Sequence, residues 1–182
     1  MSEFLSEHRA HLADNPPIAL TVERRDTERA IRLWQRKAAE SSHPPPLTEF
    51  DLEGIRSGYR FIISGGDPRS SVFLVYGSRL ANLLHLPEKP VHRWPFIEQI
   101  PERYQSIFVE GIDEALVQTA PARYSGAVLR DGQVELYRAA FMPLRLNARS
   151  AYALIFGSFN NRTVPQDALD RNRALLDQYL PH

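Results

Sequence analysis

The C-terminal half of the chain most constrains its fold, because an amphipathic helix is followed there by three strand-like runs. The helix extends from Pro101 to about Gln118, and the runs cover residues 123–130, 133–146 and 151–159. Proline suits the first turn of a helix, where its missing amide hydrogen costs little. The apolar residues of the helix share one face, which predicts packing against a sheet: Tyr104, Ile107, Phe108, Ile112, Ala115 and Leu116.

The strand-like runs predict a sheet that is apolar on both faces. Asp131 and Gly132 indicate a two-residue hairpin, since both central positions of the favoured turn need a positive φ. Alternation in the next run puts Val134, Leu136, Ala140, Met142 and Leu144 on one face and Glu135, Tyr137, Ala139 and Phe141 on the other. Each face therefore needs a covering layer, and the helix that carries Trp34 is the predicted cover of the second face.

The N-terminal half predicts this covering helix and a second hairpin. Asp26 can cap a helix that begins at Thr27, and its apolar stripe is narrow: Ala30, Ile31, Trp34 and Ala38. The prolines at 44–46 end it. Residues 59–63 and 72–76 flank a glycine-containing loop and predict two adjacent antiparallel strands. Short helices are predicted after Thr48 and after Ser78, the latter capped by Ser78 itself.

Composition excludes several chemistries. The chain has 182 residues and no cysteine, so disulfides, thiolate catalysis and iron–sulfur clusters are excluded. Lysine plus arginine and aspartate plus glutamate balance at 22 each, so no basic face for nucleic acid or anionic lipid is indicated. No apolar run approaches the ~18 residues of a membrane helix and no secretory signal is evident, so we expect a cytoplasmic protein.

Three stretches of the chain combine short apolar runs with a glycine or proline. They are Leu33-Trp34 with Pro46 and Phe50-Asp51, then Phe73 to Tyr76 with Gly77-Ser78, and finally Phe141-Met142-Pro143-Leu144 with residues 153–157. In these stretches the chain resembles the stand-alone bacterial members of the PAS-like family, the PAS_5 group. The resemblance implies an α+β fold: a five-stranded antiparallel sheet with helices on one face and flanking N-terminal and C-terminal helices. It divides the chain into a flexible arm (1–24), one PAS-like domain (25–162) and a C-terminal helix (163–182), whose pattern extends from about Gln166 to Leu180.

The resemblance implies a non-enzymatic sensory or protein-interaction module, with a ligand cavity between the sheet and the long helix. Such proteins commonly dimerise through the N-terminal helix, and the downstream protein partner is not indicated. The alternative is a small enzyme or carrier for an apolar or aromatic metabolite in the same cavity. No cofactor is expected, because photochemical flavin and thioester-linked chromophores need cysteine and residues 101–118 lack a histidine for haem. Non-covalent flavin stays open.

The candidate ligand-binding residues combine aromatic bodies with a few polar tips, as small-molecule sites usually do: Tyr76, Leu80, Trp94, Tyr104, Phe108, Tyr124, Arg138, Phe141 and Phe156. Core filling is the competing interpretation. Arg138 lies within an apolar face, where it needs an anionic or carbonyl partner if buried, or reaches water if its strand is an edge.

Two further motifs carry weaker predictions. Residues 64–68 are similar to the glycine hairpin of diguanylate cyclases, but Pro68 replaces the acidic residue, so a tight turn is expected instead. His8 and His11 have the spacing of a helical metal chelate but lie in the predicted arm, and no metal site is expected.

Overall fold

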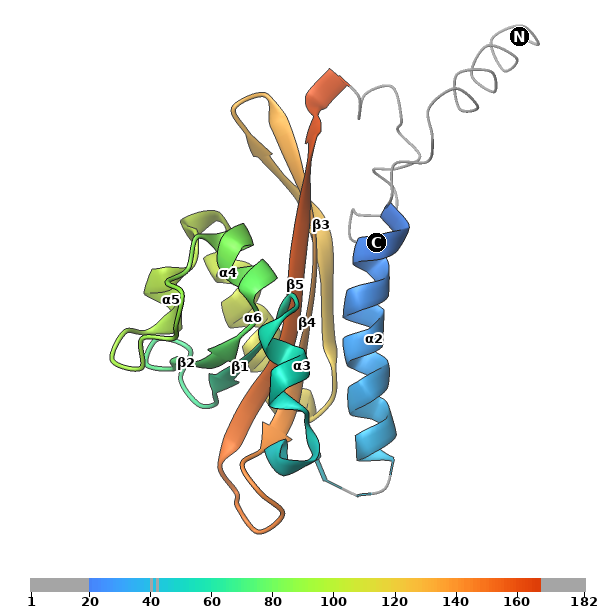
Figure 1. Ribbon diagram of the computed structural model, residues 1–182, viewed down its shortest axis with the longest axis vertical. Coiled ribbons are helices and arrows are strands. Elements are labelled where there is room, and N and C mark those ends of the chain that lie inside the picture. Colours follow the sequence, from blue (N-terminus) through green and yellow to red (C-terminus); the bar gives the residue numbers. More distant parts are fainter. Residues whose placement is uncertain (1–19, 40, 42, 168–182) are drawn as a thin grey trace, which may run out of the picture.

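The computed structural model describes residues 20–39, 41 and 43–167, and only the backbone of residues 20–25. In chain order the elements are α2 (Leu20–Ala38), η1 (Leu47–Glu49), α3 (Leu52–Arg56), β1 (Arg60–Ser64), β2 (Phe73–Tyr76), α4 (Ser78–Leu84), α5 (Phe96–Gln99), α6 (Glu102–Gln118), β3 (Ala122–Arg130), β4 (Gln133–Arg145) and β5 (Ala153–Pro165). The five strands form one antiparallel sheet in the order β2-β1-β5-β4-β3, so the fold is α+β (Figure 1).

The ladder between β4 and β5 is the longest in the sheet and joins residues 133–145 to residues 153–165. On its other edge β5 pairs with β1, so it links the N-terminal hairpin to the C-terminal strands. Both predicted hairpins are confirmed. Asp131 and Gly132 have φ values of 48° and 75°, which is the backbone that the two-residue turn requires. β5 continues to Pro165, beyond its predicted end at residue 159.

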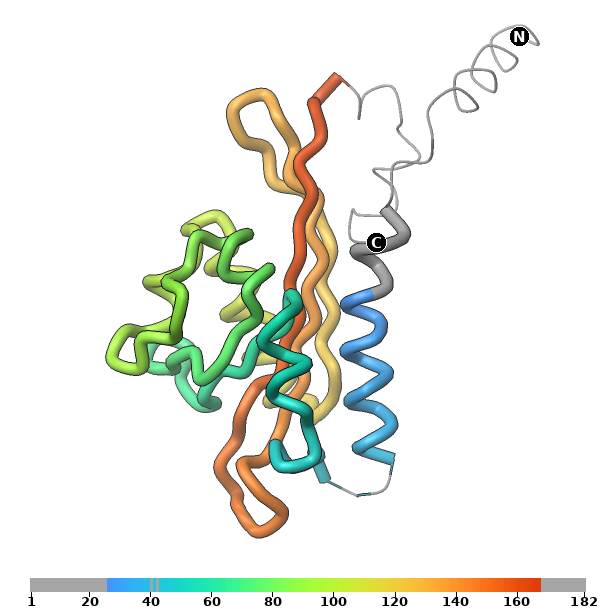
Figure 2. Tube along the Cα trace, viewed as in Figure 1, coloured from blue at the N-terminus to red at the C-terminus, as the bar shows by residue number. Residues whose placement is uncertain are grey.

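Helices cover the sheet on both sides, as Figures 1 and 2 show. α4, α5 and α6 lie on one side, called here the α6 face, and α2 runs along the other, called the α2 face. The buried side chains of the α6 face include Phe61, Phe73, Phe96, Phe108, Phe141, Ile155 and Phe159. Those of the α2 face include Ala30, Ile31, Trp34, Ile55, Ile62, Met142, Leu144, Leu154 and Phe156. The two clusters match the predicted alternation of β4.

α6 lies unusually close to the sheet at Gly111. A methyl group at this position would collide with the ring of Phe141, so glycine permits the approach although it disfavours a helix interior. The helix ends at Thr119, whose left-handed backbone (φ 52°) breaks the helical repeat. Tyr104, Ile107, Phe108, Ile112 and Ala115 are all buried, which confirms the predicted apolar face of α6.

α2 covers the second face of the sheet, as the sequence predicts. Ala30, Ile31 and Trp34 are buried, and the Trp34 indole Nε1 donates a 2.7 Å hydrogen bond to the carbonyl of Pro143 on β4. The predicted start of this helix is wrong, because α2 begins at Leu20 and Asp26 lies inside it rather than at its cap. Residues 1–19, which hold most of the predicted arm and both histidines of the candidate chelate, lie outside the described residues.

Three smaller predictions need correction or lie beyond the description. Gly77, not Ser78, is the cap residue of α4. The helix predicted after Thr48 is split into η1 and α3, and the Asp51 carboxylate caps α3 by accepting a 3.0 Å hydrogen bond from the Glu53 amide. All but the first two residues of the predicted helix 166–180 lie outside the described part of the chain. None of the helices described combines the length and the hydrophobicity that crossing a membrane requires.

Candidate functional site

Six of the nine predicted ligand-binding residues come together on the α6 face. Tyr124 of β3 is partly buried and packs against the other five. Those five are buried: Tyr76, Leu80, Tyr104, Phe108 and Phe141. They come from five different elements of the fold, so the long helix and the sheet do bring them to one place. Their role in binding a ligand stays a prediction.

The other three predicted residues lie elsewhere. Phe156 and Arg138 belong to the α2 face, because their positions on β5 and β4 alternate with those of Ile155 and Phe141. β4 is paired on both sides, so the hypothesis that Arg138 reaches water from an edge strand is wrong, and Arg138 is half-buried. Trp94 is 45% exposed, and its indole Nε1 donates to Glu98 Oε2 at 2.8 Å.

Aromatic side chains occupy the space between α6 and the sheet. The Phe108 ring lies 5.3 to 6.1 Å, centroid to centroid, from the rings of four fully buried phenylalanines, namely Phe61, Phe96, Phe141 and Phe159. Edge-to-face and tilted pairs at these distances stabilise a core beyond their buried area. The place where the resemblance implies a ligand cavity therefore holds the protein's own side chains.

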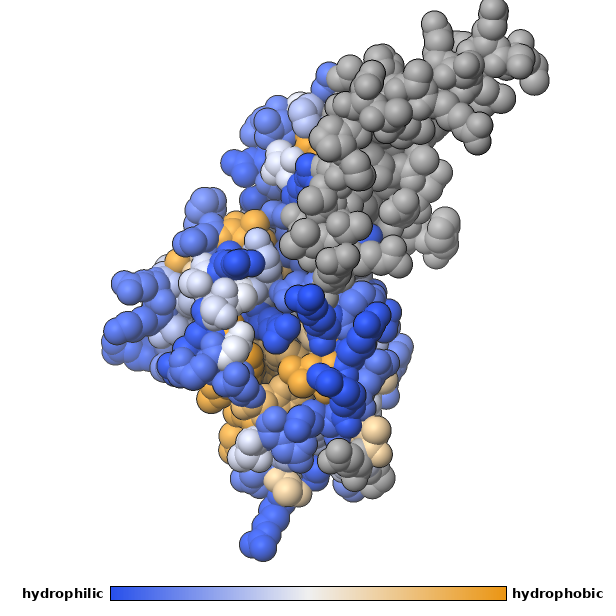
Figure 3. Space-filling model, turned by 45° about the vertical axis from the view of Figure 1, so that its right-hand side comes forward, coloured by the Kyte–Doolittle hydropathy of each residue, from blue (hydrophilic) through white to orange (hydrophobic). Residues whose placement is uncertain are grey.

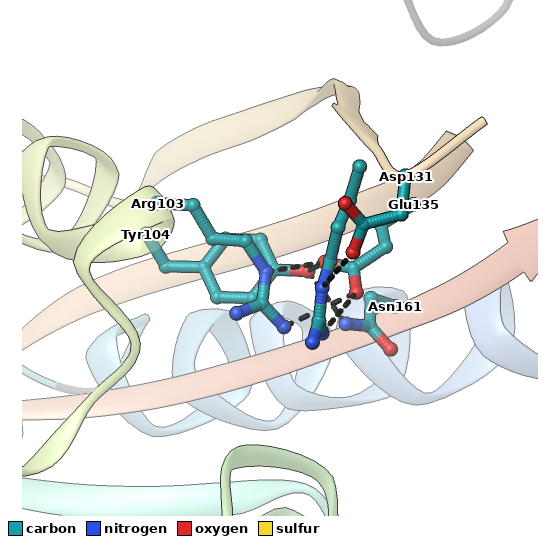
Figure 4. Close-up of polar contacts among 6 residues, drawn as sticks. Arg103, Tyr104, Asp131, Glu135 and Asn161 are labelled. Carbon is teal, nitrogen blue, oxygen red and sulfur yellow. Dashed lines mark hydrogen bonds and ion pairs between the residues drawn. The ribbon is translucent and has the colours of Figure 1, made fainter. Parts of the chain in front are cut away.

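A buried ion-pair network ties the start of α6 to the sheet (Figure 4). The Glu135 carboxylate, only 7% exposed, accepts hydrogen bonds from Arg103 Nε at 2.6 Å and Arg103 Nη2 at 3.1 Å. The Tyr104 hydroxyl donates to the same carboxylate and accepts a 2.6 Å hydrogen bond from the Asn161 amide. Arg130 Nη1, at the end of β3, lies 3.6 Å from the carboxylate. Residues of α6, β3, β4 and β5 therefore meet at the Glu135 carboxylate.

The pKa shifts in this network reflect competition between burial and hydrogen bonding. Burial by itself works to raise the pKa of Glu135, but the hydrogen bonds from Arg103 and Tyr104 outweigh it and hold the pKa below its ordinary 4.5. Burial, followed by the hydrogen bond to Glu135, raises the pKa of Tyr104 from 10.0 to about 12. Glu135 is therefore ionised and Tyr104 protonated at neutral pH, which is the state that each hydrogen bond requires.

The Glu135 network positions α6 and is not arranged as a catalytic site. Both carboxylate oxygens are occupied by donors from the protein itself, and the guanidinium of Arg103 also stacks 4.7 Å from the Tyr104 ring centre. Sequence reasoning singled out Tyr104 but missed Arg103, Glu135 and Asn161. The available signal was Glu135 itself, an acidic residue within an otherwise apolar face of β4, which needs a positive partner if buried.

An arginine cleft opens on the other side of the molecule, between α2 and β1. Its lining residues are Arg29, Arg32, Leu33, Gln35 and Arg36 of α2 and Arg60 of β1, and its volume is about 600 Å³. In Figure 3 the side that carries α2 comes forward, and strongly hydrophilic residues cover much of that surface; Leu33 is the hydrophobic residue of the cleft lining. None of these six residues is among the nine predicted ligand-binding residues.

A second surface cleft, the β2 cleft, lies at the edge of the sheet and has a volume of about 520 Å³. It is lined by Arg56, Leu74, Val75, Tyr76, Ser78, Ala81, Glu88, Lys89, Pro90 and His92. The Tyr76 hydroxyl donates to the carbonyl of Pro87 at 2.7 Å, and burial raises the pKa of Tyr76. His92 Nδ1 lies 3.1 Å from the carbonyl of Phe73, so the segment after α4 partly covers the edge strand.

The comparisons with known proteins add no family to this picture. No protein-family model matches the chain, and no curated protein matches it in sequence. Among the residues that the structure describes, no three histidine, aspartate or glutamate side chains lie close enough together to hold a metal ion.

Proposed function

We propose that this protein is a non-enzymatic PAS-like module that acts by binding another protein. The five-stranded antiparallel sheet supports this proposal, because it is compatible with the sheet that the PAS-like resemblance implies. The arrangement of the layers supports it too, since short helices and α6 pack on one face and a flanking N-terminal helix packs on the other.

The packing around Phe108 is the observation that favours partner binding over ligand sensing. A cavity that takes a metabolite usually has a volume of about 300 Å³ or more. Here five fully buried phenylalanine rings meet between α6 and the sheet, and Gly111 lets the helix approach Phe141 as closely as a ring allows. Such a module would transmit a signal by binding a partner at its surface or at the helices that pack on its sheet.

Native mass spectrometry of the purified full chain, combined with an absorbance scan, tests the proposal. The expected result is the mass of the polypeptide or of its dimer, without a bound organic molecule. A small molecule that co-purifies at one per chain and is retained at low collision energy would contradict it and would favour a sensor or a carrier. We also propose that the protein is a homodimer, and light scattering on the same sample measures whether its mass is that of two chains.

A second candidate function is the binding of a small aromatic anion in the β2 cleft. Leu74 and Pro90 offer apolar surface there, and Lys89 and His92 offer polar or positive groups. Titration with a series of aryl carboxylates, followed by NMR shifts of the Lys89 and His92 signals, tests this function. Shifts confined to the β2 cleft and abolished by Lys89→Glu are the expected result; shifts spread over the whole surface would exclude a defined site.

A further inference from the structure

The arginine cleft gathers positive charge that the fold itself does not use. Arg29, Arg32 and Arg36 recur at intervals of three and four residues, so they project from the same side of α2 and are exposed. Arg60 approaches from β1, with its side chain 20% exposed. Four guanidinium groups thus border a cleft of about 600 Å³, and Leu33 supplies an apolar contact within it.

Several arginines elsewhere in the fold have a carboxylate or carbonyl partner. Arg56 pairs with Glu53, Arg103 with Glu135 and Arg123 with Glu28, while Arg145 donates to two backbone carbonyls. In the cleft, Arg60 lies 3.4 Å from Asp26 Oδ1. Within the described part of the chain, the side chains of Arg29, Arg32 and Arg36 form no hydrogen bond or ion pair.

Arg36 lies in the last turn of α2, where a positive charge favours the helix, but the arginines also repel one another along it. Like charges three or four residues apart on a helix destabilise it by about 0.2 to 0.5 kcal/mol per pair. Arg29 and Arg32 form one such pair, and Arg32 and Arg36 form another. An anionic partner bound in the cleft would offset this repulsion, because each guanidinium can donate two parallel hydrogen bonds to one carboxylate.

The dimensions and the overall charge of the protein favour a peptide over a nucleic acid. From Arg29 to Arg36 the helix rises by about 10 Å, which is the length of roughly three residues of an extended peptide. Nucleic-acid binding commonly relies on a basic surface that follows many phosphates, whereas this chain has 22 basic and 22 acidic residues. Leu33 adds an apolar contact that suits a side chain rather than a phosphate backbone.

We propose that the arginine cleft is the docking site for an acidic segment of a partner protein, in which Asp or Glu side chains flank one apolar side chain. The carboxylates pair with Arg29, Arg32 and Arg36, and the apolar side chain packs beside Leu33. This inference deepens the proposed function and rests on it.

Fluorescence anisotropy with the full chain tests the docking site. The probe is a short fluorescein-labelled peptide in which leucines are set among glutamates, and the reference is the same peptide with glutamine in place of glutamate. We expect the glutamate peptide to bind at low salt, the glutamine peptide not to bind, and added salt to weaken binding. The triple variant Arg29→Glu, Arg32→Glu, Arg36→Glu should weaken it about tenfold or more.

A matched control separates the cleft from general electrostatics. Arg69→Glu, Arg93→Glu and Arg149→Glu make the same change in net charge at three exposed positions outside the cleft. Circular dichroism verifies that both triple variants fold. Three results would each overturn the proposal. The two triple variants could weaken binding equally, the two peptides could bind equally well, or the glutamate peptide could fail to bind the full chain. Tighter binding of a single-stranded oligonucleotide of similar length would overturn it in favour of a nucleic-acid partner.

The failure of this inference can be told from the failure of the proposed function. If native mass spectrometry finds a bound metabolite, the module proposal fails whatever the peptide does. If the protein is free of small molecules and the cleft variants still bind the peptide as the original chain does, the module proposal stands and the arginine cleft is not its docking site.

Discussion

The α6 face of the sheet is filled by aromatic rings and closed by a buried ion pair, whereas the α2 face combines an apolar cluster with a few buried polar side chains. Trp34, Met142 and Phe156 belong to the apolar cluster. Among the polar side chains, Asn160 donates to Thr27 Oγ1 at 3.3 Å, and Ser158 is fully buried. Polar contacts of this kind contribute less net free energy than apolar packing, because folding only replaces hydrogen bonds to water with hydrogen bonds within the protein.

This difference makes α6 the layer that stabilises the fold and α2 the more adaptable layer. α6 is held by rings that interlock and by hydrogen bonds to an ionised carboxylate, so any displacement exposes aromatic surface or a buried charge. α2 rests on the sheet by a narrower stripe and turns three arginines away from it. We expect changes on the α6 face to alter mainly the stability of the protein, and changes on the outer side of α2 to alter mainly its association.

The largest effect is expected from Phe108→Ala, which removes the ring at the centre of the α6 face. The variant should lose about 3 to 5 kcal/mol of unfolding free energy, because it leaves a cavity among close-packed rings. Denaturant unfolding of the two chains measures the loss. Val117→Ala, on the same helix but 85% exposed, is the control and should change stability by less than about 0.5 kcal/mol. A loss for Phe108→Ala no larger than that of the control would mean that the α6 face does not stabilise the fold.

Glu135→Gln should cost about 2 to 3 kcal/mol at neutral pH, because it removes the charge that Arg103 and Tyr104 bind. The folded pKa of Glu135 lies below its ordinary 4.5, so this stabilisation is present above about pH 4.5 and is lost as the pH falls through the folded pKa. The stability difference between the two chains should therefore shrink in acid.

Urea unfolding of both chains at pH 7 and near pH 3 measures this difference. Glu53→Gln is the matched control, since Glu53 also pairs with an arginine but its side chain is 79% exposed, and surface pairs contribute little. A constant difference across the pH range would show that the charge of Glu135 is not what stabilises the network.

The smallest of the three effects is expected on the α2 face. Trp34→Phe keeps an aromatic ring but removes the indole hydrogen bond to the Pro143 carbonyl, and should cost about 1 kcal/mol. Denaturant unfolding measures this loss, and hydrogen exchange of the α2 amides tests whether α2 opens before the sheet. Exchange of α2 and α6 at the same rate in both chains would remove the contrast between the two layers.

The elements of the fold were largely predictable, because local spacing carries their signal. Tyr104, Ile107 and Phe108 recur with the period of a helix, and residues of β4 alternate with the period of a strand. Asp131-Gly132 predicted its turn because few other dipeptides accept two positive φ values. The predicted start of α2 is wrong because Asp26 resembles a cap in sequence, whereas the helix begins at Leu20 and continues through Asp26.

The candidate site was predicted only in part. The local sequence shows which face of a helix or strand a residue occupies, but it does not show which residues of other elements lie next to it. Tyr104, Phe108 and Phe141 were placed correctly from their helix and strand positions. Phe156 and Arg138 were grouped with them on residue type alone, and the alternation of β4 and β5 puts both on the opposite face. The bond between Arg103 and Glu135 joins residues 32 positions apart, a separation at which sequence spacing carries no distance information.

The sequence by itself determined which segments become helices and strands, that the sheet needs a cover on both faces, and that no thiolate chemistry is present. Those properties follow from side-chain periodicity and from the residue inventory. Only the tertiary structure decided that phenylalanine rings fill the space beneath α6, that Glu135 finds its partner in Arg103, and that three arginines of α2 meet Arg60 at one cleft. The physical reason is that packing and pairing depend on distances between elements, which the sheet sets once its strand order and register are formed.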